Sequence, residues 1–474
     1  MKKAIASVLQ ALLVLLILIP TIAHSQTTTV IVDDLKYFLD LETRTATVIQ
    51  TAKYEINNLI IPEKITSDDI EYTVTEIGRD IAEYSALSGS VKMPNTIIEI
   101  KERAFHNTLI TAIEWSQSLE IIGDMAFDNC KYLTGELTLP KTLKSIGKKA
   151  FSRCSNLTGD LVIPNSVTFI GEEAFSSCKS LTGSLIIPNS VTQIEPSAFS
   201  NCAFTGKLTI PNSWETIPSY CFRYSNFSEI EIPEGMKTID GWAFGYCKSL
   251  TGDLVIPNSV TRIEGCAFYG CENIENITIG ENNEYIGDHA FEGCSNVKTI
   301  DIKSTIHIGE GAFSECSKLE TLILPENLKS IGNFALFNLN DEVSSPDKII
   351  CHAPIPPKNG SYIGSMYLVF NNFNSQLFVP AESLELYKTA EGWSKFFKIL
   401  PIGATAIGDV AEDADVKVSV ADGAVVVTAP VGETVTVYNI SGMCLAETKE
   451  HRIAGLAPGI YLVRVADRTF KVAL

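Results

Sequence analysis

The sequence predicts a β-rich solenoid with a cap at each end, followed by a small β-sandwich. Three observations predict this fold class. The dipeptide Ala-Phe recurs nine times between Phe105 and Phe313, in units of 22 to 24 residues. Each unit carries a short stretch of alternating apolar residues, which is typical of a strand with one buried face. From residue 409 on, the repeat is absent and strand-like segments alternate with turn residues at intervals of about ten residues.

The repeated unit is too small to fold alone. An Ile lies five residues before the repeat Phe in almost every unit, and an apolar-x-apolar-Pro segment such as 161–164 lies further upstream. A unit of this length, with only a few strand residues, cannot bury its apolar face by itself. Neighbouring units must therefore stack and share one continuous core, which predicts a solenoid for the middle of the chain.

The repeat pattern L-x-I-P-x-S-V-x-x-I-G-x-x-A-F-x-x-C-x-x-L resembles the BspA-like bacterial leucine-rich repeat family. Residues 162–178 match it at almost every position, and the resemblance covers ten to eleven units over residues 72–338. It implies a leucine-rich repeat solenoid. It also implies adhesion to host matrix or surface proteins, or to other bacteria, through the repeats.

The N-terminus predicts a secretory signal peptide at residues 1–25. Lys2 and Lys3 form a positive region, residues 11–19 form an apolar region, and residues 23–25 offer a cleavage site. The apolar run is shorter than the roughly 20 residues that a transmembrane helix needs, and an uncleaved membrane anchor is the alternative. We therefore expect a secreted or outer-surface protein with no integral membrane span after cleavage.

The charge of the chain excludes one class of partner. There are 37 Lys and Arg against 56 Asp and Glu, which gives a formal net charge of −19, and loss of Lys2 and Lys3 with the signal peptide makes it −21. A surface this acidic repels phosphate backbones, so we expect no nucleic acid partner.

Both ends of the solenoid need caps, because an open end exposes the core and unpaired strand edges. The expected N-terminal cap is 26–71 and the expected C-terminal cap is 339–402, followed by a linker at 403–408. In the C-terminal cap we expect a helix at Ala381–Trp393, with Ser383 near its start. The expected cap strands lie at residues 30–32, 37–39, 45–49, 349–351, 377–379 and 396–399.

Residues 409–474 predict the β-sandwich, with strands at 416–420, 424–428, 434–438, 459–465 and 469–473. The segments 437–442 and 455–463 resemble the C-terminal sorting domain of the type IX secretion system of Bacteroidota. This resemblance implies that the tail engages the secretion machinery and is removed after export. The alternative is an ordinary immunoglobulin-like module that stays attached.

Eight of the twelve cysteines lie three residues after the repeat Phe, so each of their units contributes one thiol at the same inward place. Stacked strands lie about 4.8 Å apart with parallel side chains, whereas a disulfide needs Cβ atoms about 3.8 Å apart that converge. A ladder of buried free thiols is favoured, and some disulfides or a metal are the alternatives. The roles of Cys221, Cys266, Cys351 and Cys444 stay open. The eight ladder residues are Cys130, Cys154, Cys178, Cys202, Cys247, Cys271, Cys294 and Cys316.

The sequence offers no sign of catalysis. It contains no G-x-S-x-G, H-E-x-x-H, Walker A or dinucleotide-binding motif, and its histidines are scattered along the chain. We therefore expect no enzyme activity, no cofactor and no metal site.

What remains is the surface of the solenoid. On the first strand of each unit, the outward residues form a stripe that is less polar than expected for a surface that contacts only solvent. On the second strand, several residues are of the types that anchor protein interfaces. Aromatic residues on strands also pack across units, which is the alternative. The candidate binding residues are Val162, Ile186 and Val255 on the first strand and Phe169, Arg262, Tyr285 and His307 on the second.

These features predict a non-catalytic, adhesin-like protein that binds a protein or glycan on a host or bacterial surface through the solenoid face. Rigid stacked units give many weak contacts, so affinity would come from area and repetition. The alternative is a structural or glycan-capturing envelope protein whose β-sandwich is permanently attached.

Overall fold

The computed structural model describes residues 27–83, 85–337, 346–359 and 375–404, and most of the C-terminal strands between 417 and 473. The chain divides into two compact units, Met1–Ile399 and Leu400–Leu474. The predicted signal peptide and most of the predicted linker lie outside the described residues. In the described part of the chain, no helix has the length and apolar character needed to cross a membrane.

The first unit begins with antiparallel strands that lead into the solenoid. Strands β1 (Thr27–Val32), β2 (Leu35–Asp40) and β3 (Thr45–Thr51) pair in sequence, at the places where strands were expected. Strand β3 then pairs in parallel with β6 (Ile70–Ile77), which also carries β5 (Lys64–Ser67). Since β6 pairs with β8 (Glu99–Ile100), the hairpins continue the sheet of the solenoid and cover its first edge.

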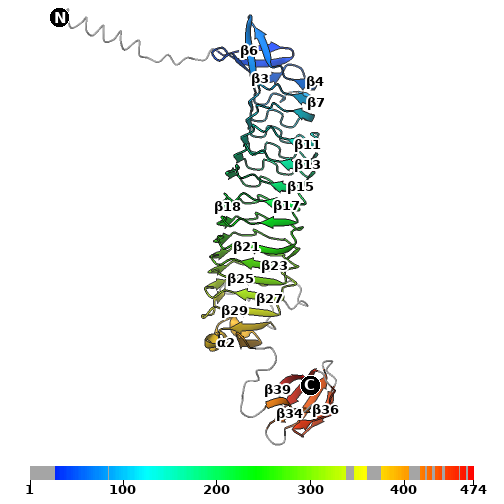
Figure 1. Cartoon of the computed structure of the whole chain (residues 1–474), viewed down its shortest axis with the longest axis vertical. Helices are drawn as coiled ribbons and strands as arrows, with labels where there is room; N and C mark the ends of the chain where they lie inside the picture. The colour runs from blue at the N-terminus through cyan, green and yellow to red at the C-terminus, as the bar shows by residue number, and fades with distance from the viewer. Residues whose placement is uncertain are drawn as a thin grey trace, which may run out of the picture. The chain divides into compact units, whose positions relative to one another are not determined.

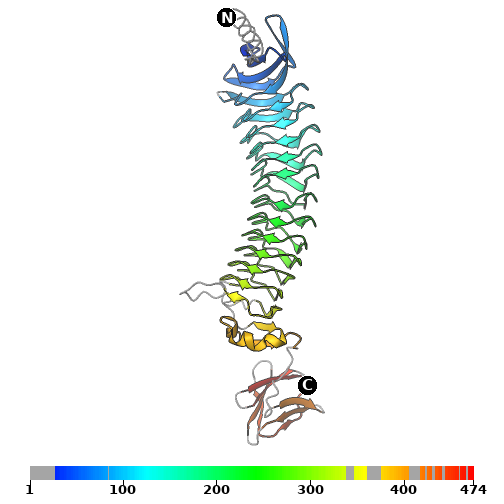
Figure 2. The same cartoon turned by 90° about the vertical axis from the view of Figure 1, so that its left-hand side faces the viewer.

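Each rung of the solenoid contributes two short strands, and most of them pair in parallel with those of the next rung, in several separate sheets (Figures 1 and 2). The first strands of successive rungs are β4 (Glu55–Ile60), β7 (Ala86–Lys92), β9 (Leu109–Glu114), β11 (Gly135–Thr138), β13 (Leu157–Val162), β15 (Leu181–Ile186), β17 (Lys207–Thr209), β19 (Glu229–Glu231), β21 (Gly252–Ile256), β23 (Ile274–Ile279), β25 (Thr299–Ile302), β27 (Thr321–Leu324), β29 (Lys348–Cys351) and β31 (Gln376–Val379). The second strands are β8, β10 (Ile121–Ile122), β12 (Ser145–Ile146), β14 (Phe169–Ile170), β16 (Gln193–Ile194), β18 (Thr216–Ile217), β20 (Thr238–Ile239), β22 (Arg262–Ile263), β24 (Tyr285–Ile286), β26 (His307–Ile308), β28 (Ser330–Ile331) and β30 (Lys358–Asn359).

The predicted leucine-rich repeat solenoid is confirmed, and it is longer than expected. It has about thirteen turns rather than ten to eleven. Parallel pairing already joins β4 to β7, and it continues through β29 and β31 after the last Ala-Phe unit. These outer turns lack the Ala-Phe signature, but their strands still bury apolar residues in the core.

A third ladder, which the sequence did not predict as such, runs through the loops that contain the repeat Phe. The backbone N–H of Phe127 donates to the Ala150 carbonyl at 2.8 Å, and the same bond recurs from rung to rung. The residues two before and two after the Phe have positive φ, as at Lys149 (55°) and Arg153 (61°). These backbone angles turn the loop so that its side chains at these positions face outward; we call this side of the solenoid the loop face.

The repeat phenylalanines form a stacked column along the centre of the solenoid. Their ring centroids lie 5.1–6.0 Å apart in successive rungs, with interplanar angles of 17° or less, from Phe105 through Phe313. All are almost completely buried, together with the Ile five residues earlier in most rungs. The continuous core that the repeat required is therefore present.

At the C-terminal end of the first unit, the helix is shorter than predicted. The segment Ala381–Trp393 holds a 3₁₀ turn at Ala381–Ser383 and α2 at Leu384–Thr389, and a second 3₁₀ turn follows at Trp393–Lys395. Ala390 is extended and Gly392 has a φ of 80°, so α2 cannot continue. The last strand, β32, spans Lys398–Pro401, two residues later than expected.

This end segment is fastened to the last rungs by buried polar side chains. The Trp393 indole donates to the Pro357 carbonyl at 2.9 Å, and the Tyr387 hydroxyl donates to the Ala353 carbonyl at 2.8 Å. Both rings are fully buried. Ser383 does not cap a helix; its hydroxyl donates to the Pro354 carbonyl at 2.7 Å.

The second unit contains two antiparallel sheets, so the predicted β-sandwich is confirmed. One sheet holds β33 (Lys417–Ala421), β34 (Ala424–Thr428) and β37 (Arg452–Ile453), and the other has the order β36 (Cys444–Thr448), β35 (Val435–Asn439), β38 (Ile460–Val465), β39 (Arg468–Ala473). Both sheets contribute to one core, built largely of valines. Strands β36 and β37 were not predicted, because β36 is mostly exposed and β37 has only two residues.

Candidate binding surfaces

The exposed apolar residues of the first strands lie in two separate places. Val162 and Ile186 are direct neighbours in the register of β13 and β15, and they are 68% and 62% exposed. Val255 is 59% exposed, but it lies on β21, which belongs to a different sheet. We call Val162 and Ile186 the apolar strand patch.

A groove of about 490 Å³ borders the apolar strand patch. Ile186, Pro188, Thr209 and Ile210 line it, together with the amide side chains of Asn165, Asn189 and Asn212. These asparagines follow the proline that ends each first strand, so the repeat itself places one amide per rung along the groove. An apolar rim beside a row of amides suits an extended polar chain with apolar side groups.

Three candidates on the second strands come together. Arg262, Tyr285 and His307 are aligned in the register of β22, β24 and β26. The Arg262 guanidinium lies 4.4 Å above the Tyr285 ring and pairs with Glu264 at 2.7 Å, while His307 Nδ1 lies 2.7 Å from the Ser330 hydroxyl. Burial raises the pKa of Tyr285. Some side chains of this row therefore pack against residues of the neighbouring rungs.

Phe169 is separate from that row. It lies on β14, half-buried, between Ser145 and Gln193 of the neighbouring rungs. The structure thus distributes the seven candidate residues over several places rather than one site, and their binding roles stay predictions.

The eight ladder cysteines are buried free thiols in the structure. Each Sγ donates to the carbonyl of the repeat Phe in the preceding rung, at 3.0–3.5 Å. Ser225 occupies the same place in its rung and donates to the Phe199 carbonyl at 3.2 Å. Burial raises the pKa of these thiols, to about 11 for Cys130 and to about 12 for Cys202, Cys247 and Cys294.

The other four cysteines are also free thiols. Cys221 is buried in the place of the repeat Ala, and Cys351 is buried 3.2 Å from the Tyr387 hydroxyl. Cys266 is half-buried on the loop face, and Cys444 is exposed in the second unit. These four cysteines are spread along the chain, and no two of them share a site among the residues that the structure describes.

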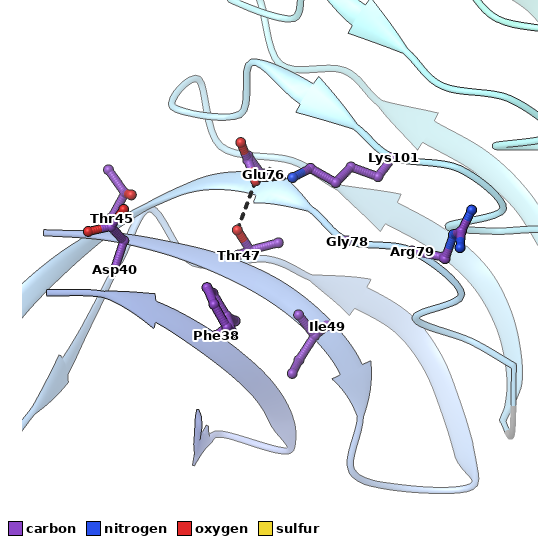
Figure 3. A pocket seen from close by; sticks show the side chains of 9 residues that line it. All are labelled: Phe38, Asp40, Thr45, Thr47, Ile49, Glu76, Gly78, Arg79 and Lys101. Atoms are coloured by element: carbon purple, nitrogen blue, oxygen red, sulfur yellow. Dashed lines mark hydrogen bonds and ion pairs between the residues drawn. The ribbon is translucent and has the colours of Figure 1, made fainter. Parts of the chain in front are cut away.

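A second hollow lies where the N-terminal hairpins meet the first rungs (Figure 3). It has a volume of about 330 Å³, and Phe38, Ile49, Glu76 and Lys101 are among the residues that line it. Glu76 accepts a hydrogen bond from Thr47 at 2.9 Å and pairs with Lys101 at 2.7 Å. Glu76 and Lys101 are therefore already paired with each other. The sequence did not indicate it, since β2, β3 and β6 contribute to it from distant positions.

Among the described residues, no group of three or more His, Cys, Asp or Glu side chains lies close enough to hold a metal ion. The described imidazoles lie in separate surroundings. His289 is 2.5 Å from Glu292, His307 bonds Ser330, and His106 lies 3.2 Å from Asp128.

One surface feature of the loops was not predicted from the sequence. The outward loop positions of three successive rungs carry Tyr220, Tyr224, Trp242, Tyr246 and Tyr269, whose rings contact one another. The signal was present as aromatic residues at fixed distances from the repeat Phe. The repeat pattern alone does not reveal it, because it does not show which way the loop side chains point.

The chain matches the family model described as a BspA type leucine rich repeat region, with six copies in residues 60–182, 158–255 and 243–347. Among solved structures, it is similar to a leucine-rich cell surface protein of Faecalibacterium prausnitzii, with 23% identity over 72% of this chain and 96% of that one and a TM-score of 0.44. A leucine-rich repeat protein of Bacteroides ovatus has 24% identity over 76% and 96%, with a TM-score of 0.46. The pneumococcal vaccine antigen PcpA has 19% identity over 80% and 99%, with a TM-score of 0.45. No curated protein matches the chain.

Proposed function

Because the chain belongs to the BspA-type leucine-rich repeat family, we propose that it is a non-catalytic, adhesin-like protein, secreted or held at the outer cell surface. Its solenoid binds a protein on a host or bacterial surface, and the apolar strand patch is the centre of that interface. The observation that carries this proposal is the exposure of Val162 and Ile186, side by side in register.

Physical chemistry supports a binding role for this patch. Two large β-branched side chains that stay more than half exposed on neighbouring strands leave apolar area in water, which an interface would remove. The amide-lined groove beside them supplies hydrogen-bond donors and acceptors at the spacing of the rungs. A partner that adds contacts over several rungs gains affinity by repetition.

The patch is tested by the double variant Val162→Lys with Ile186→Lys, using the full chain without its signal peptide. We expect binding to immobilised extracellular-matrix proteins or to intact bacterial cells to weaken at least about tenfold, because each Lys places a hydrated charge in the interface. Both sites are exposed, so stability should change by no more than about 0.5 kcal/mol per substitution. Val255→Lys is the matched control on another sheet, and an equal loss in that variant would contradict a centre at the patch.

Export is tested separately. We propose that the tail at 409–474 engages the secretion machinery and is then removed. Protein released from intact cells by protease should therefore end before about Asp409, as the mass of its C-terminal peptide would reveal. Protection from protease, with Leu474 still present, would favour the runner-up, a structural or glycan-capturing envelope protein with a permanent β-sandwich.

A further inference from the structure

The loop face carries a compact cluster of five aromatic rings around one arginine. We call it the aromatic–arginine cluster, and it comes from the three successive rungs whose second strands are β18, β20 and β22. Its residues occupy the positions two before, one after or two after the repeat Phe, and they are Tyr220, Arg223, Tyr224, Trp242, Tyr246 and Tyr269.

The rings stack from rung to rung. Tyr224 lies on Tyr246 at 4.8 Å and 3°, and Tyr220 lies above Trp242 at 6.3 Å and 7°. Tyr269 of the next rung contacts both Trp242 and Tyr246, at 5.2 Å each. Stacking therefore covers one face of each of these four rings, while Tyr220 and Tyr224 stay 38% and 44% exposed.

Arg223 lies in the middle of four of these rings. Its guanidinium carbon is 4.3 Å from the Trp242 ring centre and 4.6 Å from that of Tyr224, and it lies within 5.7 Å of the Tyr220 and Tyr246 centres. One Nη donates to the Tyr224 hydroxyl at 3.2 Å, while the buried Nε has no hydrogen-bond partner. No carboxylate of the described residues forms an ion pair with Arg223, in contrast to Arg262, which pairs with Glu264.

Two glycines hold the cluster in place. A Cβ on Gly245 would lie 2.7 Å from the Trp242 ring, and a Cβ on Gly270 would lie 2.8 Å from the Tyr246 ring. Each ring therefore rests against backbone that has no side chain. The arrangement is fixed before any partner arrives, which lowers the entropic cost of binding.

The loops around Arg223 lack negative charge, although the chain is acidic. In the four rungs with Phe199, Phe222, Phe244 and Phe268, the positions two before, one after and two after the Phe carry no Asp or Glu. At the edge of the cluster, Glu292 of the following rung hydrogen-bonds Tyr269 and contacts His289 at 2.5 Å. Arg223 is thus a partly desolvated cation whose charge nothing at these positions neutralises.

We propose that the aromatic–arginine cluster docks a protein segment that carries an Asp or Glu side chain, and that this carboxylate pairs with Arg223. A partly buried, unpaired guanidinium gains strongly from a carboxylate that approaches in its plane. Trp, Tyr and Arg are the residue types that dominate protein interfaces. A sugar ring would need an open aromatic face, and stacking already covers one face of Tyr220, Tyr224, Trp242 and Tyr246. This surface lies on the loop face, so the inference goes beyond the function proposed above.

The repeat itself supplies the test variant. Tyr220→Ser, Arg223→Ser and Tyr224→Asn together give this rung the outward residues of the preceding one, Ser197, Ser200 and Asn201. The φ values of Ser197 (60°) and Asn201 (59°) match those of Tyr220 and Tyr224 (60° each), so the backbone accepts the exchange. Arg223→Gln alone removes only the charge and serves as the second variant, and Arg103→Ser is the control at an arginine of the loop face that pairs with Asp80.

The probe is a displayed library of short random peptides, selected on the full chain without its signal peptide. We expect the bound peptides to be enriched in Asp or Glu. A fluorescent synthetic copy should bind at least about tenfold more weakly to the triple variant and to Arg223→Gln, and the same loss should follow when its acid is replaced by the amide. Binding should be unchanged in Arg103→Ser and in the Val162→Lys, Ile186→Lys protein, and the latter result separates this site from the apolar strand patch.

Two outcomes would overturn the proposal. One is a set of bound peptides without acidic enrichment, or with equal affinity for the Arg223 variants. The other is binding on a glycan array to anionic sugars that is lost in Arg223→Gln while no peptide is bound, which would assign the cluster to an anionic glycan instead.

Discussion

The solenoid is expected to lose stability steeply above about pH 9, because ten of the eleven thiols of the first unit are buried. Burial raises the pKa of these thiols from the ordinary value of 9.0, to about 11 for Cys130 and Cys351 and to about 12 for Cys202, Cys247 and Cys294. The others shift in the same direction. The physical cause is the loss of hydration that a thiolate would suffer in the core.

The direction of the effect follows from proton binding in the two states. Below pH 9 both the folded and the unfolded chain keep these protons, so stability does not depend on them. Above pH 9 the unfolded chain releases protons that the folded chain retains, and the free energy of unfolding falls by about 1.4 kcal/mol per thiol for each pH unit. If all ten thiols contributed fully, the free energy of unfolding would fall by at most about 14 kcal/mol per pH unit. This fall would level off near the raised pKa values of the thiols.

The measurement is urea unfolding followed by circular dichroism between pH 7 and pH 10, with a reducing agent present. The matched variant replaces Cys154, Cys178 and Cys202 with Ser, because Ser225 already fills this place with the equivalent hydrogen bond. Removing three thiols should reduce the slope above pH 9 by about 4 kcal/mol per pH unit. An unchanged slope would contradict the assignment to the thiol ladder, since the buried Tyr37 and Tyr387, whose pKa values are also raised, are intact in both proteins.

The sequence predicted the solenoid well because its period is carried by buried residues. The repeat Phe and the Ile five residues earlier must face the core in every rung, so their spacing defines the unit directly. The number of turns was underestimated because the outer turns pack with different residues. The terminal helix was overestimated because the pattern of Leu384 to Trp393 is helical, whereas Gly392 and the extended Ala390 end it early.

The candidate surfaces were less predictable, for a physical reason. Outward positions are free to vary, so their meaning depends on which rungs become neighbours and on what each side chain contacts. Val162 and Ile186 follow from strand alternation alone. The enclosure of Arg223 by four rings does not, because it depends on the loop backbone at positive φ and on the space left by Gly245 and Gly270.

The second large effect is expected in the phenylalanine column. Phe175 stacks between Phe151 at 5.4 Å and Phe199 at 5.5 Å and is fully buried. Phe175→Ala should lower the free energy of unfolding by about 3–5 kcal/mol, because the stacked backbone ladders prevent the neighbouring rungs from closing the cavity.

Urea unfolding of the full chain would measure this loss, with Phe175→Leu as the matched control. Leu336 occupies the equivalent place in a terminal rung and is buried there, so a Leu side chain fits the position and should cost far less. Because each rung contacts only its neighbours, a weak central rung should also divide the unfolding transition into two steps. A single unfolding transition, with the same loss of unfolding free energy in Phe175→Ala and Phe175→Leu, would contradict this account. It would mean that the phenylalanine column adds no packing energy beyond that of any apolar side chain.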